Sequence, residues 1–156
     1  MKIKRFFEKI SKIISYLPIL WQDEDWDYEY LLVLMKFKLK RMRDVIYSND
    51  IVTKDEKRNI VISINQTIDH INNYCDDIDG YERVYGKLPF EIDFKIVPTD
   101  NGCYKLKTVY KETGEQLSEQ DEERYSTHII KAHNFQQEEW NKIFDTIKAK
   151  GQKWWD

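Results

Sequence analysis

Apolar residues recur at every third or fourth position along most of the chain, which is the period of an amphipathic helix. The first such segment covers residues 2–17. Its apolar positions are Ile3, Phe6, Phe7, Ile10, Ile13, Ile14 and Leu17. We expect this helix to pack its apolar stripe on the core, with a solvated basic face; the alternative is a helix that lies on an anionic membrane. Pro18 is expected to end it, because proline disfavours helical backbone in the residue before it.

The second helical segment, about residues 26–47, is predicted to be the central, buried helix. Acidic residues precede it and Lys and Arg residues crowd its end, the order that the helix dipole favours. Its predicted buried row steps by three or four residues: Leu31, Met35, Lys38, Met42, Val45 and Ile46. Lys38 stands out in this row, because a buried ammonium needs a partner. Asp27 lies on the same row but about 16 Å from Lys38 along the helix, so the two cannot pair.

Two further segments have clear boundaries. Thr53 and Glu56 form a capping box that opens a third helix, about residues 53–75. Residues 81–90 are expected to form a loop or a broken helical turn. The period then changes to two over residues 91–97 and 103–111, and Asn101-Gly102 between them is a strong hairpin signal. We therefore predict a β-hairpin at about 91–111, which must lie against helices or pair with another chain, since two strands alone are marginally stable.

The last segment, about residues 118–150, is helical again. Ser118 with Asp121 forms its N-terminal cap, and Gly151 is a plausible C-cap. The predicted apolar stripe keeps its phase across residues 133–137, which fits one long helix; its members are Tyr125, Ile129, His133, Trp140, Ile143 or Phe144, and Ile147. Asn134 with Gln137 resembles a second capping box, which would give two helices. The predicted fold is a single mainly α domain of residues 1–156: a helical bundle around a central buried helix, with one β-hairpin (α+β).

Composition narrows the class of protein. The chain has 156 residues, 41% hydrophobic and 34% charged, with a net charge of −3. A net negative charge disfavours wholesale binding to nucleic acid. Cys75 and Cys103 are too few for a disulfide framework, which makes a reducing, intracellular setting the default. No apolar run approaches the ~20 residues of a membrane span, and we expect no membrane partner.

Motifs for catalysis are missing from the sequence. It has no glycine-rich phosphate loop, nucleophile elbow or dinucleotide fingerprint. His70, His128 and His133 are not spaced as a metal set; the latter two are five residues apart and fall on different helix faces. We therefore expect no enzymatic activity, no metal and no cofactor.

The charge pattern supplies the candidate binding residues. Five cations fall within eight residues at the end of the second helix: Lys36, Lys38, Lys40, Arg41 and Arg43. They form either a solvated helix end or part of an anion site. For the anion site, the candidate ligand-binding residues are Lys38 and Arg41, with Asp27 and Trp26 at the start of the helix. Arginine can clamp a phosphate, and aromatic rings can stack on a base. An internal carboxylate partner would instead make Lys38 structural.

Two other features have alternative interpretations. The acidic residues of segment 23–29 either reinforce the helix start or contact a basic partner. Trp154 and Trp155 either dock on the chain's own core or anchor an interface between copies, where Trp is enriched. We take these two tryptophans as interface candidates and expect a homo-oligomer.

Several short motifs suggest a family. Ile19-Leu20-Trp21, Asp25-Trp26-Asp27, Lys38-Leu39 with Met42, and the terminal Trp154-Trp155-Asp156 resemble the pattern of a family of small uncharacterised proteins encoded by tailed bacteriophages. The resemblance covers the start and the end of the chain but not the middle. It implies a phage or prophage product in the host bacterial cytoplasm and an accessory function such as anti-defence. The family has no assigned catalytic residues, so none is carried over.

Three functions remain open from the sequence. The first is a non-enzymatic protein that sequesters a phosphate-bearing signalling nucleotide, so antagonising a bacterial defence. The second is a protein–protein inhibitor of a host nuclease complex, acting through an acidic surface as anti-CRISPR proteins do. The third is a structural or packaging accessory protein. The expected partner is accordingly a small signalling nucleotide or a host defence protein.

Overall fold

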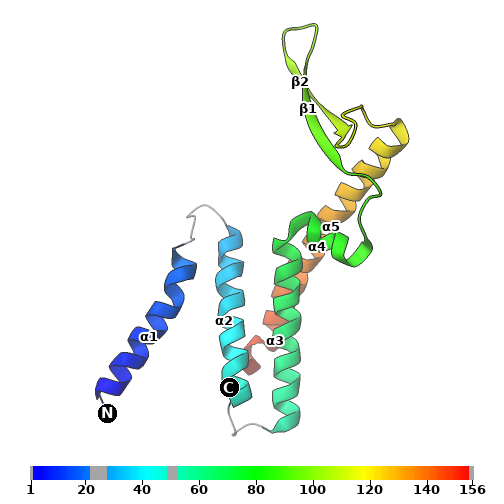
Figure 1. The fold of residues 1–156 in the computed structure, drawn as a ribbon. Coiled ribbons are helices and arrows are strands. Elements are labelled where there is room, and N and C mark those ends of the chain that lie inside the picture. The colour runs from blue at the N-terminus through cyan, green and yellow to red at the C-terminus, as the bar shows by residue number, and fades with distance from the viewer. Residues whose placement is uncertain (1, 22–27, 49–52, 155–156) are drawn as a thin grey trace.

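The computed structural model describes residues 2–21, 28–48 and 53–154. Within these ranges the chain is mainly helical, with one antiparallel hairpin, which confirms the predicted fold class. The elements are α1 (Lys2–Leu20), α2 (Tyr28–Ser48), α3 (Lys54–Cys75), α4 (Asp77–Tyr85), β1 (Ile92–Pro98), β2 (Tyr104–Tyr110), α5 (Glu119–Lys150) and a terminal 3₁₀ turn, η1 (Gly151–Trp154). Figure 1 shows α1, α2 and α3 as a row, with α5 crossing α3 and the hairpin projecting beyond one end. In the described part of the chain, no helix is long and apolar enough to cross a membrane.

The central helix is α3, so the prediction that segment 26–47 holds this place is wrong. α3 packs against α2, α4 and α5. Seven of its residues are buried: Val61, Ser63, Ile64, Thr67, Ile68, Ile71 and Tyr74. The sequence pointed to α2 as the central helix because its apolar run is denser than that of α3. An apolar run shows that a helix has apolar surface, but the number of neighbouring helices decides how much of that surface is covered.

The buried face of α2 also differs from the predicted row. Leu32 and Leu39 are 0% and 4% exposed, whereas Leu31 and Val45 are 58% and 63% exposed. Lys38 is exposed and does not lie in the core. Residues 31–34 are all apolar, so two neighbouring rows fit the helical period equally well. The packing against α3 selects the row that contains Leu32 and Leu39.

Helix α1 departs from expectation in two ways. It continues through Pro18 to Leu20, with the Trp21 amide donating to the Leu17 carbonyl at 2.9 Å. Pro18 has no N–H to donate to the Ile14 carbonyl, and the helix continues for two residues beyond it. The apolar stripe of α1 is also exposed, so the prediction that it packs on the core is wrong. Contacts with α2 come from the other face, where the Tyr16 ring lies 4.9 Å from the Phe37 ring.

The third helix begins as predicted and ends at a sharp turn. The Thr53 hydroxyl accepts from the Glu56 amide at 3.4 Å, which confirms the cap. After Cys75 the chain turns at Asp77, whose φ of 49° lies in the left-handed region that Asp tolerates. Residues 77–85 then form α4, so the predicted loop begins only at Gly86. Gly80 allows α4 to approach α3, because a Cβ there would lie 2.1 Å from the Asn73 carbonyl oxygen.

The hairpin is confirmed, with Ile96 opposite Leu106 and Gly102 at a φ of +74° in the turn. Among the described residues, its hydrogen bonds to the helices lie at its base. There the Tyr110 hydroxyl donates to Asp121 at 2.6 Å and accepts from the Ser118 amide at 3.3 Å. Four apolar side chains toward its tip are exposed: Phe94, Ile96, Tyr104 and Leu106. In Figure 1 this end of the hairpin projects away from the helices.

Segment 118–150 is one helix, which settles the choice between one helix and two. The Ser118 hydroxyl accepts from the Asp121 amide at 3.2 Å, so the predicted cap is confirmed. The buried residues of α5 are Ala132, Phe135, Glu139 and Ile143. His133, which the predicted stripe included, is exposed. The buried row of α5 therefore differs from the predicted stripe in the middle of the helix, and it includes the carboxylate of Glu139.

Candidate functional site

A cavity of about 310 Å³ lies between α1, α2 and the C-terminal turn η1. Its lining residues are Lys12, Tyr16, Lys38, Arg41, Met42, Val45, Ile46 and Trp154. Two of the predicted ligand-binding residues, Lys38 and Arg41, therefore lie at one cavity. Lys12 from α1 adds a third cation, which sequence reasoning missed because only the packing of α1 beside α2 brings it to Lys38, 26 residues later in the chain.

Arg41 is held in place by groups on α1 and α2. Its guanidinium carbon lies 5.5 Å from the centre of the Tyr16 ring and 5.7 Å from the centre of the Phe37 ring. It also donates a hydrogen bond to the Ser15 hydroxyl. Aromatic ring faces at these distances attract a cation, and they orient the planar guanidinium group of Arg41. The partners of Arg41 in these contacts are uncharged, so its positive charge is not neutralised by them.

Trp154 forms the opposite wall of the cavity. α5 continues without a break into η1, with Gly151 in helical backbone and its amide donating to the Ile147 carbonyl. This turn brings the indole back onto α3, where Nε1 donates to the Ser63 hydroxyl at 2.9 Å. Trp154 is 8% exposed and belongs to the main core. Of the two alternatives for this residue, the structure has docking on the chain's own core, which corrects the assignment of Trp154 to an interface between copies.

Three predicted site residues cannot be placed. Trp26, Asp27 and Trp155 lie outside the described residues. Of the acidic segment 23–29, which the inhibitor hypothesis invokes, residues 23–27 also lie outside the described part of the chain. The homo-oligomer likewise stays a prediction.

The cavity is cationic on one side and apolar on the other. Lys12, Lys38 and Arg41 supply the charge, and of the eight described lining residues none is acidic. The remaining wall is formed by aliphatic and thioether side chains of α2 and by the indole. A cavity with both features suits a ligand that has an anionic group and an apolar ring.

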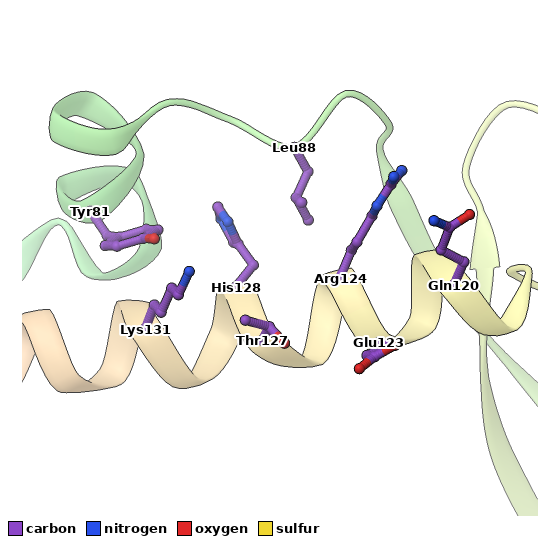
Figure 2. Close-up of a pocket in the computed structure, with 8 residues that line it drawn as sticks. All are labelled: Tyr81, Leu88, Gln120, Glu123, Arg124, Thr127, His128 and Lys131. Carbon is purple, nitrogen blue, oxygen red and sulfur yellow. The ribbon is translucent and has the colours of Figure 1, made fainter.

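A second cavity, of about 410 Å³, lies between α4 and the first half of α5. Figure 2 shows Arg124, His128 and Lys131 rising from α5 toward α4 and the loop that carries Leu88. Glu82 holds the imidazole, with 3.1 Å between Glu82 Oε1 and His128 Nε2. The Tyr81 ring packs edge-on against the same imidazole at 5.0 Å.

The charges of this second cavity are largely matched within the protein. Arg124 pairs with Asp121 at 3.2 Å, His128 with Glu82, and Glu123 adds an acid to the lining. The His128 and Glu82 side chains are only 10% and 15% exposed. We therefore interpret this pair as a polar link that fastens α4 to α5, and we favour the first cavity as the binding site.

A polar cluster around a buried carboxylate joins α3 to α5. Glu139 is 2% exposed, and its carboxylate accepts from His70 Nδ1 at 2.7 Å, Asn73 Nδ2 at 3.0 Å and Lys142 Nζ at 2.8 Å. Burial by itself raises the pKa of Glu139, but these hydrogen bonds outweigh it and hold the pKa below its ordinary value. Sequence reasoning missed the cluster. A signal was available, since Glu139 stands four residues from both Phe135 and Ile143 in an apolar row.

Comparisons of the chain with protein-family models, curated proteins and solved structures found no match. The resemblance to bacteriophage proteins therefore stays a prediction.

Proposed function

We propose that the chain is a non-enzymatic binding protein that takes a compact, phosphate-bearing nucleotide in the cavity between α1, α2 and η1. The observation that carries the proposal is the convergence of Lys12, Lys38 and Arg41 on one cavity with an apolar wall. The cations attract and orient the phosphate, and the wall contacts the base. The described lining offers no carboxylate or imidazole to act as a general base, which favours binding over hydrolysis.

The size of the cavity limits the ligand. Small-molecule sites typically have volumes of about 300–1,000 Å³, and 310 Å³ is at the lower end of this range. A mononucleotide, linear or cyclic, fits such a site better than a dinucleotide. Sequestration of a signalling nucleotide, as a phage product that antagonises a bacterial defence would require, is the role we propose for this binding.

Isothermal titration calorimetry tests the proposal. The panel consists of AMP, ADP, cyclic mononucleotides, a cyclic dinucleotide and inorganic phosphate. We expect a mononucleotide to bind, and added salt to weaken the binding because the contacts are partly exposed charges. Lys38→Ala should weaken binding about tenfold, since it removes a charge-assisted contact to the phosphate.

Lys40→Ala is the matched control. Lys40 is an exposed lysine on the same helix, two residues from Lys38, but it does not line the cavity. We expect this variant to bind like the wild type. Absence of binding across the panel, or equal weakening by the two variants, would contradict the proposal.

A further inference from the structure

Helix α1 carries an apolar stripe that nothing in the described chain covers. The exposed fractions along it are Phe6 60%, Phe7 64%, Ile13 62%, Ile14 57%, Leu17 50% and Leu20 51%. Trp21, directly after the helix, is 90% exposed. Contiguous apolar surface of this kind on a folded chain marks a contact with a partner or a membrane.

The way α1 meets α2 leaves this stripe available. α1 contacts α2 through Ser15, Tyr16 and the Ile19 carbonyl, which accepts from the Tyr30 hydroxyl at 2.7 Å. These groups belong to the polar side of the helix. Figure 1 shows α1 at the outer edge of the row of helices, on the side of α2 away from α3. A flat surface can therefore approach the stripe without meeting the rest of the helical layer.

The charge of α1 identifies the partner. Within Lys2–Leu20 there are five Lys or Arg residues and one Glu, in a chain whose net charge is −3. α1 therefore carries a formal charge of +4 and the remainder of the chain a net −7, although α2 also has more cations than acids. A basic polar face with Phe, Ile and Leu on the other face is the pattern of a helix that lies in the interface of an anionic bilayer. Trp21 is the type of residue that concentrates at the headgroup level of a membrane.

A second copy of α1 fits the stripe less well. In each seven residues of α1, three belong to the stripe; the adjacent pairs Phe6-Phe7 and Ile13-Ile14 show this width. A two-stranded coiled coil buries only two positions in seven, so it would leave one position of the stripe uncovered. Lys9 lies at the rim of the stripe, one helical turn from Ile13. Pairing two stripes would bring like charges together, which is unfavourable.

We propose that α1 binds the surface of membranes that contain anionic phospholipid, with its apolar stripe in the acyl boundary and the cations that flank the stripe, such as Lys9, among the headgroups. This contact requires no membrane-spanning helix. It uses a different surface from the proposed nucleotide binding, because none of the exposed stripe residues lines the cavity; Lys12, which does line it, belongs to the cavity and not to the headgroup contact.

Cosedimentation of the full chain with vesicles tests the proposal. We expect binding to vesicles of phosphatidylcholine mixed with phosphatidylglycerol, and little binding to phosphatidylcholine alone. Ile14→Asn should lower the partition coefficient about tenfold, the effect of removing one large aliphatic side chain from the apolar phase. Ile14 is exposed in the free protein, so the variant should keep the circular dichroism spectrum of the wild type.

Ile130→Asn on α5 is the matched control. Ile130 is 61% exposed, close to the 57% of Ile14, and it also lies within a helix. We expect it to bind vesicles normally, as should Lys38→Ala, which alters only the cavity. No binding to anionic vesicles, equal binding to neutral ones, or equal loss with Ile130→Asn would overturn the proposal. Reversible dimerisation that Ile14→Asn abolishes, without vesicle binding, would assign the stripe to a second copy instead.

Discussion

Replacing Glu139 by Gln removes the charge at the centre of the polar cluster between α3 and α5 while keeping the shape of the side chain. The amide oxygen can still accept from His70 and Asn73 at the position of Oε2, where the distances are 2.7 and 3.0 Å. The amide nitrogen then faces Lys142, and two donors cannot bond each other. The substitution therefore loses the hydrogen bond from Lys142 and weakens the two from His70 and Asn73, whose acceptor is no longer charged.

The expected cost follows from the strength and the exposure of these bonds. Hydrogen bonds to charged groups contribute about 1.5–3 kcal/mol each. Lys142 is 47% exposed and can turn to water, which compensates part of the loss. We expect the free energy of unfolding to fall by about 2 kcal/mol, or Tm by about 4–8 °C for a chain of this size. Urea unfolding followed by circular dichroism measures the change.

The pH dependence gives a second readout. Folding lowers the pKa of Glu139 from its ordinary value of 4.5. Its contribution to stability is therefore fully present above that value and is lost as the pH falls through the lower pKa of the folded state. The difference between wild type and Glu139→Gln should be largest near about pH 7 and should shrink toward about pH 3.

Glu138→Gln is the matched control, because Glu138 is the exposed neighbour on the same helix. Its effect should stay within about 0.5 kcal/mol. The reasoning is refuted if the two variants are equally stable, or if the deficit of Glu139→Gln is as large in acid as at neutral pH.

Three further substitutions test the packing of the chain. Ser63→Ala should lower stability by about 1–2 kcal/mol, because the buried Trp154 N–H loses its acceptor at 2.9 Å; thermal unfolding measures this. Gly80→Ala should destabilise by more than about 2 kcal/mol in urea unfolding, because the new Cβ would overlap a backbone carbonyl of α3 at 2.1 Å. Tyr110→Phe should raise the pKa of Asp121 toward 3.8, since the Tyr110 hydrogen bond is the main cause of its lowering; NMR titration of the carboxyl carbon measures the pKa.

Each of these expectations has a clear opposite. Ser126→Ala, at an exposed serine of α5, should be nearly neutral, and an equal effect of the two serine variants would contradict the role of Ser63. Gly→Ala in a helix usually stabilises by about 1 kcal/mol, so a stabilised Gly80→Ala would contradict the close approach of α4 to α3. An unchanged pKa of Asp121 in Tyr110→Phe would contradict the link between the hairpin base and α5.

Much of the secondary structure could be predicted from the sequence because its signals are local. The caps at Thr53 and Ser118 each involve an amide three residues away, and both form as expected. The hairpin turn needs a residue with positive φ, which Gly102 supplies. Such interactions are complete within a few residues, so the sequence alone determines them.

The placement of the helices could not be predicted in this way. The buried face of α2 is decided by contact with α3, because an apolar run around a helix fits more than one row. The cavity joins Lys12, Lys38 and Trp154, and the Glu139 cluster joins residues 66 and 69 positions apart. By itself, the sequence determined most of the elements, with α4 the exception, and the cluster of cations near Lys38. The tertiary structure alone decided that α3 is central, that the α1 stripe is exposed and that these cations share a cavity, because those outcomes depend on which surfaces meet, and residues distant along the chain set that.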